Sequence, residues 1–351
     1  MLYFVNDYSA GAHEKIMRRF METNLEKTSP YGSDHYSASA AEKIRQACAC
    51  PQAQVAFVSG GTQTNQLAID SLLLPHEGVI CAESGHINTH ESGAVEFTGH
   101  KVLTLPEHDG KLDAEELADF LRRFYIDENY EHAVIPGLVY ITFPTEFGSI
   151  YSKAELTRLR QVCDEYSLQL YLDGARLGYG LACRENDLSL PDIAALTDAF
   201  YIGGNKVGAL FGEALVFTKN NMPKHFVSHL KRHGAMMAKG RVLGLQFDTL
   251  FTDDLYFALG RHANAMAEQI RQTFRDLGIS QLVDTVSNQI FPILPDKLLE
   301  KLAEKFTFTE QERIDEAHRA VRFCTSWATT RENVELLCKD LEEIYKNDIE
   351  T

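Results

Sequence analysis

Short apolar segments alternate with amphipathic helical patterns between about residue 40 and residue 220, and this alternation constrains the fold more than any other feature. Helical patterns cover Thr64–Leu74, Ala114–Tyr125 and Lys153–Tyr166, with Asp113 and Ser152 as expected N-caps. The expected strands are short runs rich in branched and aromatic side chains: Val55–Val58, Val79–Cys81, Val102–Leu105, Leu138–Thr142, Leu168–Leu172, Ala199–Ile202 and Ala214–Phe217. Strands that alternate with helices are typical of βαβ units, so we expect an α/β fold with a mostly parallel sheet of seven strands.

The pattern changes after about residue 250 to longer helical segments. Leu255–Leu277 and Pro295–Phe306 have helical patterns, and a charged helix is expected from Arg331. Arg322–Ser326 has the pattern of a strand, and Gln281–Phe291 is expected to form one further strand pair. A chain of 351 residues has room for roughly two domains. We therefore expect a large α/β domain at residues 1–250, including the N-terminal segment, and a smaller α+β domain at residues 251–351.

The net charge excludes two classes of partner. Asp and Glu number 50 against 34 Lys and Arg, which gives a formal charge of −16 at pH 7. Such a field repels phosphate backbones and anionic lipid heads, so we expect neither nucleic acid nor a membrane as a partner. No apolar run reaches the roughly 18 residues of a membrane span, and the first residues lack the pattern of a signal peptide. We therefore expect a cytoplasmic protein.

Two polar motifs follow expected strands at the sheet edge where open α/β sheets bind ligands. Asp173 and Arg176 come directly after Leu168–Leu172, and Lys206 follows Ala199–Ile202 and two glycines. The carboxyl ends of parallel strands share one edge of the sheet, so these side chains are expected to meet. A lysine whose pKa is lowered by its neighbours is the residue that forms Schiff bases. Taken singly, the acid could instead cap the next helix and the lysine could be a solvated charge.

A third motif is the glycine turn 59–65, Ser-Gly-Gly-Thr-Gln-Thr-Asn, which follows the strand Val55–Val58. It begins a helix with free backbone N–H groups and a favourable dipole, which suits a phosphate group. It is neither a Walker A loop nor a dinucleotide fingerprint. A Schiff-base lysine, an acid for a pyridinium nitrogen and a phosphate-binding helix start are together what pyridoxal 5′-phosphate requires.

These motifs belong to a longer series. With them, the sequence resembles the threonine aldolase (β-eliminating lyase) family of fold-type I pyridoxal-phosphate enzymes. The resemblance implies a large domain with a seven-stranded sheet and a smaller C-terminal domain. It is carried by the segments Asn6–His13, Tyr31–Asp34, Ser59–Thr62, Glu83–His86, Glu91–Ala94, Asp173–Arg176, Gly203–Lys206 and Val321–Trp327.

The resemblance implies a role for each matched residue of the cofactor site. Lys206 would bind the cofactor covalently, and Asp173 would hydrogen-bond its pyridinium nitrogen. Gly61 and Thr62 would bind the phosphate, and His86 would stack on the pyridine face. The chemistry requires no metal ion, and the other histidines form no zinc-ligand spacing.

The substrate carboxylate would be held by a second group of residues. Arg176 and Arg322 resemble the pair that grips it, a role suited to the bidentate guanidinium group. Asn6 stands where many family members have serine, and its amide can still donate a hydrogen bond. Phe143, in a segment less polar than the family pattern, is expected to change the wall of the cleft.

The activity implied by the resemblance is retro-aldol cleavage of L-threonine or L-allo-threonine to glycine and acetaldehyde. The base for the β-hydroxyl proton would be His86, His132 or an ordered water. Other lyase (β-elimination), transaminase or racemase activities remain alternatives, because the scaffold does not fix which bond at Cα breaks. A non-catalytic protein that binds a phosphorylated ligand is the alternative outside this class. Family members build their sites at subunit interfaces, so we expect a homodimer or homotetramer in which cations of the segment 231–241 reach a neighbouring subunit's phosphate.

Overall fold

The large domain is built on the expected seven-stranded sheet, here described from a computed structural model that covers residues 1–348. The strand order is β2-β8-β7-β6-β5-β3-β4, and β8 alone among these strands runs antiparallel to its neighbours. All seven expected strands are present within a few residues of their expected ends. They are β2 (Gln54–Val58), β3 (Glu77–Ala82), β4 (Val102–Leu105), β5 (Ile135–Thr142), β6 (Gln169–Asp173), β7 (Ala199–Gly203) and β8 (Glu213–Phe217).

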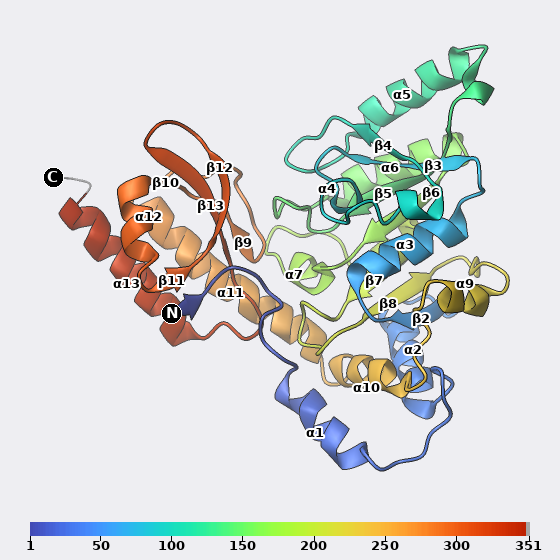
Figure 1. Ribbon diagram of the computed structural model, residues 1–351, viewed down its shortest axis with the longest axis horizontal. Coiled ribbons are helices and arrows are strands. Elements are labelled where there is room, and N and C mark those ends of the chain that lie inside the picture. The colour runs from blue at the N-terminus through green and yellow to red at the C-terminus, as the bar shows by residue number, and fades with distance from the viewer. Residues whose placement is uncertain (349–351) are drawn as a thin grey trace.

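Helices cover both faces of this sheet (Figure 1). In β5, Val139 and Ile141 belong to the core on one face, and Leu138 and Tyr140 belong to the core on the other. This explains why the strands read as continuous apolar runs rather than as alternating ones. The first core is completed by α2 (His35–Ala47), α5 (Ala114–Ile126), α6 (Lys153–Glu165), α8 (Leu190–Leu196) and α10 (Arg241–Leu250), and the second by α3 (Gly61–Leu72), α4 (His86–Thr89) and α9 (Phe226–Arg232).

The expected helix N-caps are confirmed, but one helix begins earlier than expected. The Asp113 carboxylate accepts hydrogen bonds from the first turn of α5, and Ser152 forms a capping box with Glu155 in α6. α3 begins at Gly61 rather than at Thr64, because the glycine turn itself forms the first helical turn. The turn and the helix are therefore one element, whose N–H groups point out of its first turn.

The C-terminal domain packs its helices against a small antiparallel sheet. Three expectations needed correction: the helix at Pro295–Phe306 ends at Leu302, the strand at Arg322–Ser326 runs from His318 to Cys324, and Gln281–Phe291 forms one bridge and a two-residue strand instead of a strand pair. The elements are α11 (Leu255–Asp276), β9 (Gln289–Ile290), β10 (Ile293–Pro295), α12 (Asp296–Leu302), β11 (Phe306–Thr307), β12 (Thr309–Arg313), β13 (His318–Cys324) and α13 (Arg331–Asp348).

The N-terminal segment begins in the C-terminal domain and only then joins the large domain. β1 (Leu2–Tyr3) pairs with β11, and Phe4 is buried in the core of the C-terminal domain, against Phe323. We had expected the whole segment to belong to the large domain. The apolar side chain of Phe4 is buried by α11 and β13, whereas α1 (Glu14–Thr23) packs on α10 in the large domain (Figure 1). The segment therefore crosses between the two domains.

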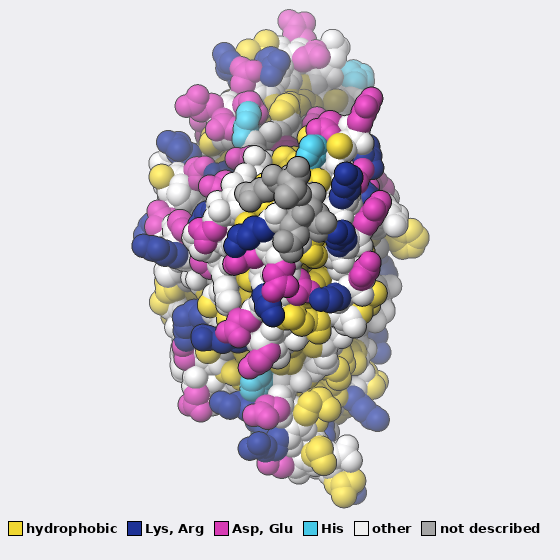
Figure 2. Space-filling view, turned by 90° about the vertical axis from the view of Figure 1, so that its left-hand side faces the viewer, with side chains coloured by type: hydrophobic (Ala, Val, Ile, Leu, Met, Phe, Trp, Pro, Cys, Tyr) yellow, Lys and Arg dark blue, Asp and Glu magenta, His cyan; other side chains and the backbone are white. Residues whose placement is uncertain are grey.

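The surface of the C-terminal domain carries mixed charge. Figure 2 shows acidic and basic side chains interspersed over this face of the molecule. Along α13 the exposed charges form i,i+4 pairs such as Lys339 with Glu343, while Val334, Leu337 and Leu341 are buried. Among the described helices, none is long and apolar enough to cross a membrane.

Candidate active site

A cavity of about 210 Å³ lies at the edge of the sheet where the parallel strands end. Six of the nine residues expected in the site contribute to its wall: Gly61, Thr62, His86, Asp173, Arg176 and Lys206. The remaining wall residues are Tyr8, Glu91, Thr142, Pro144, Glu146, Ala175, Tyr201, Asn205 and Glu213. The topology thus brings together residues that are up to 205 positions apart in the sequence (213 − 8).

Asp173 is the best-supported side chain of the cavity. It ends β6, is 1% exposed, and accepts hydrogen bonds from the Asn65 amide at 2.8 Å and the Tyr140 hydroxyl at 2.6 Å, both at Oδ2. Its Oδ1 accepts from the Ala175 N–H at 2.9 Å. Three donors hold the carboxylate in one orientation, which is what a partner for a ring nitrogen requires.

His86 is held by a neighbouring acid. Its Nδ1 lies 2.8 Å from Glu91 Oε1, and the same oxygen accepts a hydrogen bond from Asn65. Burial lowers the pKa of His86, but the hydrogen bond to Glu91 and the negative charges of Glu146 and Asp173 outweigh it and raise the pKa above the ordinary value. The hydrogen bond to Glu91 places the proton on Nδ1 and leaves Nε2 available when the ring is neutral.

Lys206 follows β7 in a half-buried position, with its Nζ 6.0 Å from the centre of the Tyr8 ring. Burial and the positive charge of Arg176 lower its pKa, and the nearby carboxylates of Asp7 and Asp173 only partly oppose this shift. A lowered pKa increases the fraction of the neutral, nucleophilic amine.

The glycine turn 59–65 forms another part of the wall. Gly60 precedes α3 as its N-cap and has no side chain to occupy the first-turn N–H groups of Gly61 and Thr62. A β-carbon at Gly61 would lie 3.1 Å from the Tyr201 hydroxyl, so a larger residue would crowd the cavity here. The N-terminus of a 12-residue helix therefore faces the cavity and can accept an anion.

Arg176 is bound by an acid that the sequence analysis did not single out. Its Nε and Nη2 donate to Asp7 at 2.7 and 3.1 Å, and Asn288 donates to the same carboxylate at 3.0 Å. Burial disfavours the charged form of both groups. Their mutual attraction outweighs burial, so it raises the pKa of Arg176 and lowers the pKa of Asp7. Nη1 bonds to no described residue, so one edge of the guanidinium group is available to a ligand.

Three expected site residues lie outside the cavity wall. Asn6 forms a local turn, with Oδ1 accepting from the Tyr8 N–H and the Ser9 hydroxyl. Arg322 donates to the Gln289 side chain and to the Val5 carbonyl, next to the segment that carries Asp7. His132 is exposed in a short 3₁₀ helix before β5, at the opposite end of that strand from the cavity.

Phe143 does not form the wall of the cleft as we had expected. Its ring is fully buried in the core of the large domain and packs against Gly180. Its neighbours Thr142, Pro144 and Glu146 line the cavity instead, and the Thr142 hydroxyl donates to Glu146 at 3.2 Å. The segment therefore contributes a polar surface to the cavity and an apolar one to the core.

Several polar wall or support residues were missed by the sequence analysis. Asn65 lies one helical turn after Gly61, so the i,i+4 spacing could have placed it on the same face of α3. Tyr140 precedes the end of β5 by two residues, which places it on the same face of the strand as Thr142. Glu213 begins the antiparallel strand β8, and only the direction of that strand brings it to this edge. The pairing of Asp7 with Arg176 has no signal in the sequence.

Comparisons with known proteins agree with this site. The family model described as beta-eliminating lyase matches residues 4–294. The chain is 30% identical over 349 residues to the low specificity L-threonine aldolase of Pseudomonas aeruginosa, and the match covers 96% of each chain. The threonine aldolase structure from Leishmania major is 42% identical, has a TM-score of 0.95, and is matched over 98% of this chain and 99% of that one.

A more distant structure shares the fold alone. Serine palmitoyltransferase of Sphingomonas wittichii is 13% identical, with a TM-score of 0.74 over 98% of this chain and 87% of that one. The fold is thus the one expected from the sequence motifs, that of the fold-type I enzymes. Since the family model spans most of the chain and an aldolase relative matches it nearly end to end, the chain belongs to the β-eliminating lyase family and, within it, to the threonine aldolases.

Proposed function

We propose that the protein is a pyridoxal 5′-phosphate-dependent L-threonine aldolase that cleaves L-threonine or L-allo-threonine to glycine and acetaldehyde. The observation that carries the proposal is the shared cavity of Lys206, Asp173 and the first turn of α3. The donor set fits the cofactor: a lysine of lowered pKa for its aldehyde, a rigid carboxylate for its ring nitrogen and free N–H groups for its phosphate.

The bound cofactor would supply an electron sink for the bond that breaks at the substrate Cα. Asp173 keeps a proton on the ring nitrogen, and its three hydrogen bonds fix its direction. Arg176 binds the substrate carboxylate through the guanidinium edge that Asp7 leaves open. A fixed carboxylate would orient the substrate, and with it the Cα–Cβ bond that is to break, toward the electron sink that the cofactor supplies.

Of the two candidate histidine bases, His86 lies in the cavity wall, whereas His132 is exposed at the other end of β5. We assign removal of the β-hydroxyl proton to Nε2 of His86 or to a water that this nitrogen binds. Glu91 keeps the other nitrogen protonated, so the free lone pair stays on Nε2.

The test is to incubate the protein with pyridoxal phosphate and each threonine diastereomer, with serine as a control, and to measure acetaldehyde, glycine, pyruvate and ammonia separately. We expect acetaldehyde and glycine in equal amounts. Keto acid and ammonia without glycine would replace the proposal with β-elimination. Borohydride reduction should attach the cofactor to Lys206, and Lys206→Ala should lose both attachment and turnover. Absence of any cofactor adduct would favour the non-catalytic binding protein.

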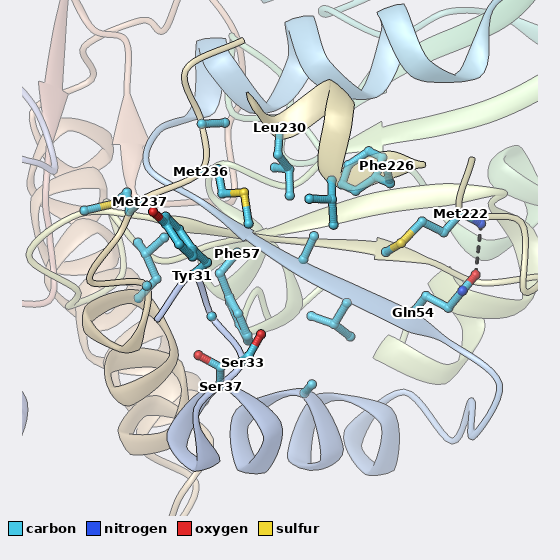
Figure 3. Close-up of a pocket in the computed structure, with 18 of the residues that line it drawn as sticks. Tyr31, Ser33, Ser37, Gln54, Phe57, Met222, Phe226, Leu230, Met236 and Met237 are labelled. Atoms are coloured by element: carbon cyan, nitrogen blue, oxygen red, sulfur yellow. Dashed lines mark hydrogen bonds between the residues drawn. The ribbon is translucent and has the colours of Figure 1, made fainter. Parts of the chain in front are cut away.

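We further propose that the active form is a homo-oligomer. A second, larger cavity of about 690 Å³ lies along β2, an edge strand of the sheet, between α2 and the segment that follows α9. Figure 3 shows Phe57, Leu230 and Met236 directed into this hollow. Tyr31 on its wall is 45% exposed, and Lys231 Nζ lies 4.7 Å from the centre of the Tyr31 ring. An apolar hollow beside the basic segment 231–241 suits a second copy of the chain.

A further inference from the structure

Glu213 occupies a position in the cavity that the proposed mechanism does not use. β8 runs antiparallel to the rest of the sheet, so its first residue lies where the other strands end. The register pairs Glu213 with Val58 on one side and with Gly203 on the other. Val58 leads into the phosphate-binding turn, and Gly203 begins the loop that carries Lys206. Glu213 therefore lies between the phosphate-binding turn and the lysine loop.

The carboxyl group of Glu213 is buried and close to the first turn of α3. The residue is 3% exposed and lines the cavity. Its Oε2 accepts a hydrogen bond from the Gly204 N–H at 2.9 Å, and Oε1 lies 4.0 Å from the position that a β-carbon on Gly61 would occupy. Within the described residues, no lysine, arginine or histidine forms an ion pair with it.

A buried carboxylate at this place conflicts with a phosphate group if both are charged. Two anions in a low-dielectric site repel each other strongly, whereas a protonated carboxyl carries an O–H that can donate to a phosphate oxygen. Burial raises the pKa of Glu213 to about 8, and backbone N–H groups and Lys206 only partly oppose this shift. A bound phosphate would raise it further, because it adds negative charge.

We propose that Glu213 is a phosphate-binding residue that acts as a neutral acid, donating a hydrogen bond from its carboxyl group to the phosphate of the bound cofactor. The proposal rests on the proposed function, since the phosphate belongs to that cofactor. Its consequence is that, above pH 8, cofactor binding takes up about one proton at this side chain, in addition to any proton taken up at the ring or the lysine.

Other ionisable groups surround Glu213 and must be separated from it. Lys206 follows β7 and Asp173 ends β6. Tyr171, Tyr201 and Tyr256, on β6, β7 and α11, lie near enough for the charge of Glu213 to act on their hydroxyl groups. The three tyrosines have pKa values raised by burial and stay neutral near pH 8. Lys206 is the remaining group that could titrate, and it reacts with the aldehyde whether or not a phosphate is present.

The experiment compares pyridoxal phosphate with pyridoxal, which shares the aldehyde and the ring but lacks the phosphate. The apoprotein is titrated with each between pH 7 and pH 9, above the phosphate pKa near 6. Both ligands react with Lys206 through the aldehyde, so the titration of Lys206 changes both dissociation constants equally. It therefore cancels in their ratio. For the wild type we expect the advantage of the phosphorylated form to fall about tenfold over this range, because a group of pKa about 8 goes from mostly protonated to mostly ionised.

Glu213→Gln keeps the shape of the side chain and a neutral hydrogen-bond donor that does not titrate. In this variant the preference for pyridoxal phosphate over pyridoxal should change by less than about twofold over the same pH range. The matched control is Glu335→Gln, which alters an exposed carboxylate on α13 outside the cavity and should behave like the wild type. At pH 9, binding of pyridoxal phosphate to the wild type should take up about one proton more than binding of pyridoxal, because Glu213 is mostly ionised in the free protein and protonated in the complex. Proton uptake measured in weakly buffered solution decides the question even if Glu213→Gln does not fold.

Three results would overturn the proposal. A tenfold fall that persists in Glu213→Gln would place the titrating group elsewhere, and an equal fall for both ligands would place it at the ring or the lysine. Equal proton uptake with the two ligands at pH 9 would exclude an acid that phosphate binding protonates. Failure of both ligands to bind at any pH would instead refute the proposed function, and this inference with it.

Discussion

At the scale of single residues, the site depends on buried acids that each have a distinct environment. Asp173 is surrounded by hydrogen-bond donors, Asp7 is paired with a guanidinium group, and Glu213 meets mainly backbone N–H groups. The same chemical group is thus held in three different ways within one cavity region. Each environment predicts a different response to neutralisation of the charge.

Asp173→Asn should keep the cofactor and lose most of the turnover. The amide has no charge with which to hold a proton on the ring nitrogen, and its NH₂ group would compete with the donors of Asn65, Tyr140 and Ala175. We expect kcat to fall at least about a hundredfold. Single-turnover assays with the cofactor content measured spectroscopically test this, with the exposed Asp276→Asn as control. Equal rates would remove Asp173 from the mechanism.

Asp7→Asn should destabilise the protein and weaken substrate binding. The change leaves the buried charge of Arg176 without its partner, which costs about 3–5 kcal/mol. Because the pKa of Asp7 is lowered in the folded state, its contribution is present above the unfolded pKa and is lost as pH falls through the folded value. Thermal denaturation should show a lower midpoint at pH 7, and KM should rise.

The control for this prediction is Asp284→Asn, whose side chain is 85% exposed and 3.9 Å from the nearest arginine nitrogen. Its thermal midpoint should match that of the wild type. An unchanged midpoint and KM in Asp7→Asn would mean that the pair neither stabilises the fold nor orients Arg176.

Glu91→Gln should lower the pKa of His86. Although burial lowers that pKa, the hydrogen bond to Glu91 is the largest of the contributions that raise it, and the amide carries no charge. In the wild type, the raised pKa stabilises the folded state below the unfolded value of about 6.5, and this contribution is lost as pH rises through the folded pKa. NMR titration of the His86 ring measures the shift. The acid limb of the kcat/KM profile should move to lower pH in parallel, and a profile that stays in place would argue against His86 as the base.

At the scale of elements, the ends of helices and the close contacts between them position the site. Arg176 is the N-cap residue of α7 (Leu177–Leu181), and α7 packs directly on α11. The contact is close because Gly260 on α11 faces the backbone of Gly178. The direction of the guanidinium group is therefore tied to a helix contact that lies outside the cavity.

Gly260→Ala should test this connection. Alanine favours a helix over glycine by about 1 kcal/mol, but its β-carbon would lie 2.2 Å from the Gly178 carbonyl oxygen. A backbone atom cannot move aside as a flexible side chain can. The overpacking should therefore destabilise the fold by about 1–3 kcal/mol or more, which exceeds the gain in helix preference. We expect a lower thermal midpoint and a higher KM, because α7 shifts with Arg176. Gln272→Ala, at an exposed position of the same helix, is the control; a stabilised Gly260→Ala would refute the contact.

At the scale of the whole molecule, the net charge disfavours polyanionic partners, whereas an exposed apolar surface favours a second copy of the chain. The net charge of −16 disfavours polyanions, and the basic segment 231–241 is a local exception to it. Arg232 and His233 bind Asp70 within the same chain, so these two cations are already engaged. Lys231 lies over the Tyr31 ring at the large apolar hollow, beside the edge strand β2. This surface is where we expect a second copy to bind.

Met237→Asp should shift the protein toward monomers and lower its activity. The side chain lines the 690 Å³ hollow, and a buried unpaired charge in an interface is unfavourable. Sedimentation velocity over a range of concentrations measures the change. Leu336→Asp, on the exposed face of α13 in the C-terminal domain, should leave the assembly intact. A fully active monomer of the wild type would contradict the proposed assembly.

The sequence alone determined the seven strands of the large sheet, several of the helix starts and the polar side chains that follow those strands. Apolar runs specify strands, caps such as Asp113 specify helix starts, and the motifs around Lys206 and Asp173 specify which side chains end those strands. These are local properties, because a strand or a cap depends mainly on neighbours within a few residues. The family resemblance rests on the same local segments, and the comparisons confirm it.

Only the tertiary structure decided which distant polar groups meet. The pairing of Asp7 with Arg176 joins positions 169 residues apart, and Glu213 reaches the cavity because β8 reverses direction. His132 lay before β5, at the opposite end of that strand from the cavity. Phe143 turned into the core, because a large apolar ring is more stable when it is buried. Such outcomes depend on packing across the whole domain, and periodicity within one segment carries no information about them.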